Sequence, residues 1–142
     1  MQTVSDILRT KGNDVVAVNP NDSVLHALGV MAEHEVGAVL VIDEDKLVGI
    51  LSERDYARKV VLAGRSSKDS RIGDVMTSQV ICVSPERTVD ECMALVTDRR
   101  VRHLPVVEHK RVIGVVSIGD LVKAMIAHQE FTITQLQMYI AG

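Results

Sequence analysis

The sequence predicts an α+β protein in which two β-α-β-β-α repeats pack about a pseudo-twofold axis. The first observation behind this prediction is a duplication: a shift of 65 residues places Asp55 on Asp120 and the first half of the chain on the second. The second observation is size. A repeat of roughly 60 residues is marginal as an independent domain, so the two repeats should share a core. The hydrophobic content of 46% is sufficient for that core without metals or disulfides.

The duplication is visible in three blocks that align without gaps. VVAVNPNDSV (15–24) lies over VICVSPERTV (80–89), AVLVI (38–42) over HLPVV (103–107), and GILSERD (49–55) over GVVSIGD (114–120). A leading turn, SDIL (5–8), matches GDVM (73–76) at a slightly different shift. Because proline, glycine, serine and aspartate all stay in register, we interpret the match as a true internal repeat.

Each repeat begins with a short strand and a helix. Residues 15–18 and 80–83 are β-rich and end at an Asn-Pro or Ser-Pro pair. Thr88 with Glu91 forms the pattern of a capping box at the start of the second helix, whereas Ser23 would cap the first helix without such a partner. The apolar positions then recur at helical spacing. They are Val24, Ala27, Leu28 and Met31 in one repeat and Val89, Cys92, Met93 and Val96 in the other.

A hairpin and a second helix complete each repeat. The apolar runs 38–42 and 47–51 are joined only by the polar residues Asp-Glu-Asp-Lys, and so short a link predicts a β-hairpin. The second helix is expected to start near Glu53 in the first repeat and near Ile118 in the second. We also expect Cys82 and Cys92 to be small buried residues, because the repeat places them opposite Ala17 and Ala27; a redox role is the alternative.

The sequence divides into residues 1–63 (first repeat), 64–71 (a polar, glycine-led linker), 72–127 (second repeat) and 128–142 (a C-terminal helical extension). In the extension Ile133, Leu136 and Ile140 recur at helical spacing beside Tyr139, which gives one apolar face. We expect this face to pack across a homodimer interface. Docking of the extension onto its own subunit is the alternative.

Composition excludes several classes of function. The net charge of −3 and the lack of aromatic residues among the basic ones argue against nucleic-acid binding. No apolar run approaches the roughly 20 residues of a membrane span. The N-terminal residues lack the pattern of a signal peptide. We therefore expect a cytoplasmic protein without membrane association. The histidines show no metal-ligand spacing, and no catalytic constellation is present, so we expect no metal and no enzymatic activity.

A tandem β-α-β-β-α unit with Gly-h-h-Ser-x-x-Asp near each end (h, hydrophobic) resembles a pair of CBS domains, named after cystathionine beta-synthase. The resemblance extends roughly from Val4 to Ile126. The segments LSERDYARKV, AGRSSKDS and RRVRHLPVV are most similar to stand-alone bacterial pairs and to small plant proteins that contain only this module.

The resemblance implies a nucleotide sensor that binds AMP, ADP, ATP, S-adenosylmethionine or a nicotinamide dinucleotide in two clefts between the repeats. In such pairs the motif Asp holds both ribose hydroxyls and the Ser lies near the phosphate, which implies these roles for Asp55 with Ser52 and for Asp120 with Ser117. A carboxylate suits two hydroxyl donors, and a helix N-terminus suits an anion. The alternative is that the serines only cap their helices and the aspartates only complement the helix dipole.

The resemblance also implies the remaining residues of each cleft. The Asp120 cleft would contain Arg102, His103, Gly119, the trio Val36, Gly37 and Ala38, and the segment from Lys11 to Val15. The Asp55 cleft would contain Met76 and Thr77 beside Gly37 and Ala38. Gly37 would allow a base to approach closely.

Arg54 distinguishes the two motifs, because Gly119 takes its place in the second repeat. Arg58 and Lys59 follow about one helical turn later. A positive cluster near a helix N-terminus opposes the helix dipole but suits a phosphate. We therefore expect the Asp55 cleft to bind the more anionic ligand and the Asp120 cleft a smaller one such as AMP. A solvated basic face is the alternative.

These observations predict a homodimeric regulatory module that senses an adenine nucleotide, AMP or NAD in the first instance, and modulates a partner protein that the sequence does not identify. The competing hypothesis is a purely structural interaction or dimerisation module that binds no ligand.

Overall fold

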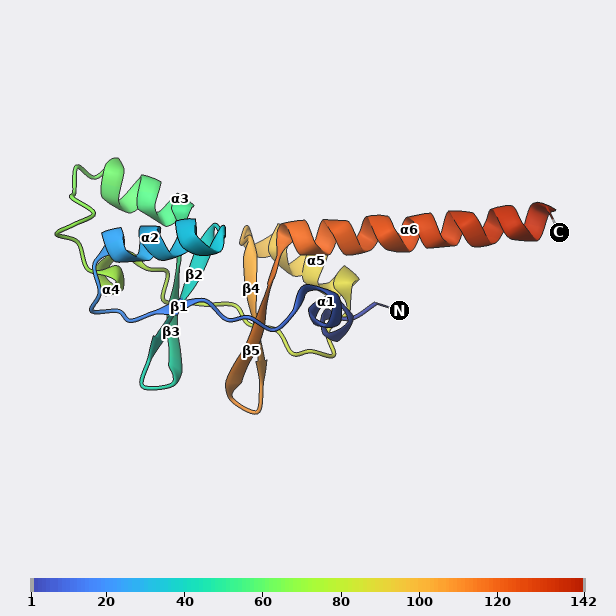
Figure 1. Ribbon diagram of the computed structural model, residues 1–142, viewed down its shortest axis with the longest axis horizontal. Helices are drawn as coiled ribbons and strands as arrows, with labels where there is room; N and C mark the ends of the chain where they lie inside the picture. Colours follow the sequence, from blue (N-terminus) through green and yellow to red (C-terminus); the bar gives the residue numbers. More distant parts are fainter. Residues whose placement is uncertain (1, 142) are drawn as a thin grey trace. The chain divides into compact units, whose positions relative to one another are not determined.

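The structure is a computed structural model that describes residues 2–141 (Figure 1). Contacts divide the chain into two compact units that each combine distant parts of the sequence. The first-repeat unit comprises Asp14–Ile81 with Lys110–Val112. The second-repeat unit comprises the N-terminal segment up to Asn13, Cys82–His109 and the chain from Ile113 onward. Each unit is therefore built around one repeat.

The first-repeat unit confirms the predicted β-α-β-β-α order. A three-stranded sheet has the order β1-β2-β3, with β1 parallel to β2 and β2 antiparallel to β3. The helix after β3 continues without a break into a π-helical turn, η1. The elements are β1 (Ala17–Val18), α2 (Val24–His34), β2 (Ala38–Asp43), β3 (Lys46–Ser52), α3 (Glu53–Tyr56), η1 (Ala57–Val61) and α4 (Ile72–Val75).

The core of this unit is aliphatic, as the composition predicts. The apolar stripe of α2 packs against the inner face of the sheet. The helix α4, which follows the linker in the sequence, adds two buried side chains to the same core. All of these side chains are buried, because the helical and strand periodicities direct them to the same side. The core residues are Val18, Val24, Ala27, Met31, Val39, Val41, Leu51, Val60, Ile72 and Val75.

The predicted hairpin closes through two residues with positive φ. Glu44 has a φ of 49° and Asp45 a φ of 66°. Such a pair suits a type I′ turn, whose twist matches that of the two strands. In the second repeat His109 and Lys110 have φ values of 51° and 64° at the equivalent position. The two hairpins therefore use the same turn chemistry without glycine.

The second-repeat unit differs from the prediction in its first strand. Its elements are α1 (Val4–Lys11), α5 (Val89–Arg99), β4 (His103–Glu108), β5 (Arg111–Ser117) and α6 (Ile118–Ala141). Residues 80–83 form only an isolated bridge from Val83 to Val106. In the first repeat Leu40 N–H donates to Val16 O, at 3.0 Å. Pro105 replaces Leu40 and has no N–H, so the equivalent bond cannot form.

The leading segment of each repeat docks on the other repeat. Val4 N–H donates to Arg87 O at 2.8 Å, and Ile72 N–H donates to Asp22 O at 2.9 Å. These two bonds are equivalent under the duplication. As a result α1 belongs to the second-repeat unit and α4 to the first-repeat unit. The compact units thus exchange their leading segments relative to the linear repeats.

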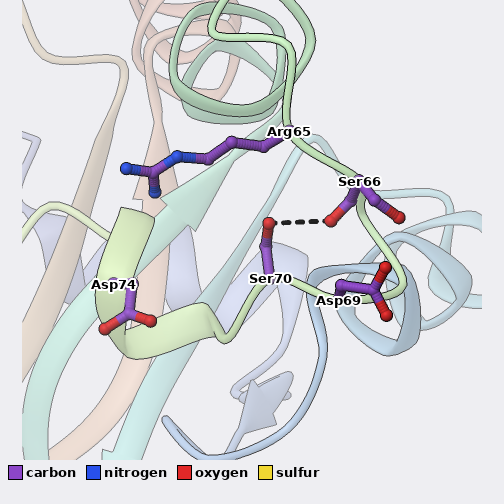
Figure 2. A pocket seen from close by; sticks show the side chains of 5 residues that line it. All are labelled: Arg65, Ser66, Asp69, Ser70 and Asp74. Atoms are coloured by element: carbon purple, nitrogen blue, oxygen red, sulfur yellow. Dashed lines mark hydrogen bonds between the residues drawn. The ribbon is translucent and has the colours of Figure 1, made fainter.

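The polar linker supports the start of α2. Val24 N–H donates to Ser70 O and Leu25 N–H to Ser67 O, both at 2.9 Å. These are N–H groups that a helix start leaves without intrahelical partners. Within the linker Ser70 Oγ donates to Ser66 O at 2.7 Å (Figure 2). An open hollow of about 680 Å³ lies here; Figure 2 shows its lining side chains, Arg65, Ser66, Asp69, Ser70 and Asp74.

The prediction for the two cysteines is half correct. Cys92 is fully buried in α5, as expected from its equivalence to Ala27. Cys82 is exposed, so the expectation of a buried residue is wrong at this position. Its counterpart Ala17 is also exposed, next to the buried Val18. Successive side chains of an extended segment point to opposite faces, and both residues lie on the outer one.

Two glycines allow a matched test of the docking of the segment around Met76. A Cβ at Gly49 would clash with the Met76 side chain and would lie 2.9 Å from Thr77 O. We expect Gly49→Ala to destabilise the protein by about 1–3 kcal/mol, because backbone must move. Gly29 in α2 has no heavy atom within 4 Å of the equivalent point. Gly29→Ala should therefore stabilise the protein by about 0.5–1 kcal/mol in urea denaturation. Equal effects of the two variants would contradict this packing.

Candidate functional site

The two motif serines lie where a strand ends and a helix begins. Ser52 ends β3 and is the N-cap of α3, and Ser117 ends β5 directly before α6. Ser52 Oγ accepts from Asp55 N–H, and Ser117 Oγ accepts from Asp120 N–H, both at 3.1 Å. The serines therefore do cap their helices, as the structural alternative proposed.

The motif aspartates complete the same caps. Asp55 Oδ2 accepts from Ser52 N–H at 3.0 Å, and Asp120 Oδ2 accepts from Ser117 N–H at 2.8 Å. This reciprocal arrangement is a capping box with Asp in the third helical position. It holds both carboxylates in a defined orientation at a helix N-terminus, which is a site suited to binding hydroxyl donors beside an anion.

The other oxygen of Asp55 faces two polar groups. Thr77 Oγ1 donates to Asp55 Oδ1 at 3.2 Å, and Lys59 Nζ lies 3.3 Å from the same oxygen. The structure thus brings Thr77 to Asp55 as expected, although they are far apart in the sequence. The Lys59 contact was not expected. Its signal is the i,i+4 spacing from Asp55, which places both side chains on one helix face.

Asp120 is paired with a lysine from the N-terminal segment. Lys11 Nζ lies 2.6 Å from Asp120 Oδ2 and also donates to Val115 O at 2.7 Å. Partial burial tends to raise the pKa of Asp120, but the Lys11 hydrogen bond and charge and the Ser117 bonds outweigh it and lower that pKa. Asp120 is therefore a stable anion that already has a cationic partner.

The two motifs consequently differ in what the exchanged segment supplies. The segment after α4 supplies the neutral hydroxyl of Thr77 to Asp55. The end of α1 supplies the ammonium of Lys11 to Asp120. The two aspartates therefore receive different donor groups from these two segments.

The basic cluster around Asp55 has two members that remain available. Arg54 and Arg58 are exposed, and neither forms an ion pair with any other described residue. Lys59 is instead committed to Asp55. At the equivalent of Arg54, Gly119 has room for a side chain, because a Cβ there would lie 3.6 Å from Ser117 Oγ.

Gly37 faces a carboxylate in the first-repeat unit. A Cβ at Gly37 would lie 3.2 Å from Glu53 Oε1, and Glu53 N–H donates to Gly37 O at 3.0 Å. A hollow of about 360 Å³ adjoins this contact and is lined by apolar residues and two glutamates. Its lining residues are Leu28, Met31, Ala32, Glu35, Val36, Gly37 and Glu53.

The remaining expected residues are distributed over both units. Val15 and Ala38 are partly buried in the first-repeat unit, where Met76 packs at Gly49. In the second-repeat unit Arg102 O accepts from Ile118 N–H at 2.9 Å, and His103 begins β4. The grouping of Val36, Gly37 and Ala38 with Asp120, and every ligand-binding role, stays a prediction.

Within residues 2–141, no cluster of three or more His, Cys, Asp or Glu side chains could hold a metal ion. None of the helices in this range combines the length and hydrophobicity needed to cross a membrane.

The repeat, the fold and the doubled Ser-x-x-Asp cap define a tandem module, and comparison with known proteins identifies its class. The CBS domain profile matches residues 4–62 and 72–127, so the chain belongs to the CBS domain family. The chain is 40% identical over 149 residues to CBS domain-containing protein CBSX3, mitochondrial, from Arabidopsis thaliana. That match covers 99% of this chain and 72% of the plant protein.

Solved structures agree with this assignment. A protein with CBS domains from Burkholderia ambifaria MC40-6 is 50% identical, with a TM-score of 0.87, and the match covers 90% of this chain and 96% of that one. The CBS domain pair of protein MJ0100, solved with 5-methylthioadenosine and S-adenosyl-L-methionine, is 27% identical. Its TM-score is 0.76, and the match covers 87% of this chain and 99% of that one.

The Lys11–Asp120 pair can be tested by titration. We expect Lys11→Met to raise the pKa of Asp120, because the variant removes a hydrogen bond and a positive charge from the carboxylate. A depressed carboxyl pKa stabilises the fold above the unfolded pKa, and this contribution is lost as pH falls through the folded pKa. In Lys11→Met, the stability contribution of Asp120 should therefore be smaller, and its loss should be complete at a higher pH.

Carbon-detected NMR of the Asp120 carboxyl between pH 2 and 6 (roughly the aspartate range) measures this shift. Lys123→Met is the matched control, since Lys123 lies on the same helix but forms no ion pair with Asp120. An unchanged Asp120 midpoint in Lys11→Met would show that the pair does not persist in solution.

Proposed function

We propose that this protein is a regulatory module that binds an adenosine-containing ligand and transmits its presence to a partner protein. The main support is the doubled capping box, which orients Asp55 and Asp120 in the same way in both units. A ribose offers two adjacent hydroxyl donors, and an ionised carboxylate accepts such bonds more strongly than a neutral oxygen does. In this mechanism the hydroxyls replace lysine contacts on the carboxylates.

The basic side chains support a phosphate-bearing ligand at Asp55. Arg54 and Arg58 are exposed and lack ion-pair partners among residues 2–141, so a phosphate would not have to displace an acid. A guanidinium can donate two parallel hydrogen bonds to a phosphate. We therefore assign the more anionic ligand, such as NAD or ATP, to the Asp55 site. The Asp120 site, with glycine in place of Arg54, would bind a smaller ligand such as AMP.

Similarity to a solved structure supports the general class of ligand, although not its exact identity. The MJ0100 pair was solved with two adenosine derivatives, and its match to this chain is nearly complete. The proposed action is regulation of another protein by a homodimer, without catalysis and without a metal.

A structural module that binds no ligand is the second candidate. It is favoured by the lysines that already contact both motif aspartates, at 2.6 Å for Lys11 and 3.3 Å for Lys59. It is also favoured by the exposed apolar residues of α6. In this alternative the motif would serve only to cap helices.

A ligand panel separates the two candidates. We expect AMP, ADP, ATP, NAD, NADH or S-adenosylmethionine to raise the Tm, because a ligand that binds only the folded state stabilises it by mass action. GMP and CMP serve as controls and should have a much smaller effect. A flat response to every adenosine compound at millimolar concentration would favour the structural module.

The individual roles can be separated by substitution. Asp55→Asn and Asp120→Asn keep an oxygen for the cap but remove the charge, so each should weaken one binding event by roughly 1.5–3 kcal/mol, about ten- to a hundredfold in Kd. Arg54→Ala should weaken binding of a phosphate-rich ligand such as ATP more than binding of adenosine. Calorimetry with both compounds measures the difference. Equal losses for the two would exclude a phosphate contact by Arg54.

A further inference from the structure

The last helix continues far beyond the second repeat. α6 is one uninterrupted helix of 24 residues, from Ile118 to Ala141 (Figure 1). Every residue from 126 to 141 is exposed, so this part of the helix does not dock on its own subunit. The side chains left open to water include Phe131, Ile133, Leu136, Met138, Tyr139 and Ile140. An isolated helical segment of this length is marginally stable in water, and an apolar one is a liability.

One face of this helix has the spacing of a coiled coil. Ile126, Ile133 and Ile140 are seven residues apart. A second series with the same spacing consists of Val122, Gln129 and Leu136, each of which precedes one of these isoleucines by four residues. At about 100° per residue, all six lie within about 80° of the helix circumference. We call these six residues the seam. The apolar ones are between 41% (Val122) and 82% (Ile140) exposed.

The residue types indicate how many helices the seam joins. Isoleucine occupies the first heptad position three times, and leucine occupies the fourth position once. β-Branched residues at the first position with leucine at the fourth favour two parallel strands. Gln129 is the one polar residue in the seam. In a parallel pair it meets Gln129 of the second copy, and an amide can both donate and accept a hydrogen bond there.

The charge of this segment fits a second copy of the same chain. Between residues 126 and 141 the only charged side chain is Glu130, which lies beside the seam and not in it. Two copies therefore meet without like charges across the contact. Helices that bind membrane surfaces carry lysine and arginine on their polar face, and this segment has neither.

We propose that two copies of this chain pair along the seam of α6 as a parallel, two-stranded coiled coil. The proposal rests on the homodimer of the proposed function and specifies which residues join it. Phe131 and Met138 lie on the opposite side of the helix and remain outside the pair. Because Asp120 lies in the first turn of the same helix, the proposed assembly site and one motif aspartate share a rigid element.

The first test is a pair of matched double variants in the full chain. Ile133→Asp with Leu136→Asp places like charges in the seam, whereas Thr134→Asp with Gln135→Asp adds the same charges on the outer face. We expect the seam variant to raise the dimer dissociation constant at least tenfold in analytical ultracentrifugation, and the outer variant to change it less than threefold. Equal effects would overturn the seam, and a wild-type tetramer would overturn the two-stranded pair.

The second test determines direction. In a Cys82→Ser background, which removes the exposed thiol, Ile126→Cys and Ile140→Cys should each form an intermolecular disulfide in glutathione buffer. Gln135→Cys is the outward-facing control and should not. An antiparallel pair would instead cross-link only when the Ile126→Cys and Ile140→Cys proteins are mixed, and this would overturn the proposal.

The tests also separate this proposal from the proposed function. If the wild-type chain is a dimer and no seam substitution weakens it, the homodimer stands and the seam is excluded as its interface. A monomeric wild-type chain excludes the homodimer itself. Nucleotide-induced changes in Tm, measured on the seam and outer variants, report the ligand-binding role independently of either result.

Discussion

The exchange of leading segments between the repeats is the constraint on which both units depend. Val4 donates to Arg87, and Ile72 donates to Asp22, through backbone hydrogen bonds that occupy equivalent positions in the duplication. Buried backbone groups without partners are costly, so each repeat needs the segment that precedes the other one. The exchange also determines which side chains reach the two motif aspartates, because the segments end at Lys11 and Thr77, which contact Asp120 and Asp55.

The Ser-x-x-Asp motif combines a structural role with the proposed binding role. The capping box uses the serine hydroxyl and one carboxylate oxygen, so the motif is required for the helix start whether or not a ligand binds. The same box orients the carboxylate at the positive end of the helix. Both interpretations offered by the sequence therefore describe one arrangement of atoms. A substitution that removes the carboxylate entirely would alter stability and binding together, which is why asparagine is the informative replacement.

The differences between the repeats carry as much information as their likeness. Pro105 in place of Leu40 reduces the first strand of the second repeat to a bridge, because proline cannot donate the required hydrogen bond. The leading segments also differ, because one pairs Lys11 with Asp120 and lowers its pKa, whereas the other supplies the hydroxyl of Thr77 to Asp55. Gly119 in place of Arg54 removes a positive charge from one motif. The two motifs of the duplicated module therefore have chemically distinct surroundings.

The sequence by itself determined the repeat, the order of elements in the first repeat, the hairpins and helix caps, because these depend on neighbours a few residues apart or on the duplication itself. Thr88 with Glu91 is the capping box that local spacing predicted, and Ser52 is the helix cap that it offered as one interpretation. The family resemblance added Thr77 and Lys11 as site residues. The contact of Lys59 with Asp55 was missed although its i,i+4 spacing is local. Only the tertiary structure decided that Lys11 pairs with Asp120 and that Cys82 is exposed. Those outcomes depend on which atoms meet across long separations in the chain, and on which face of an extended segment points outward, and no periodicity in the sequence encodes either.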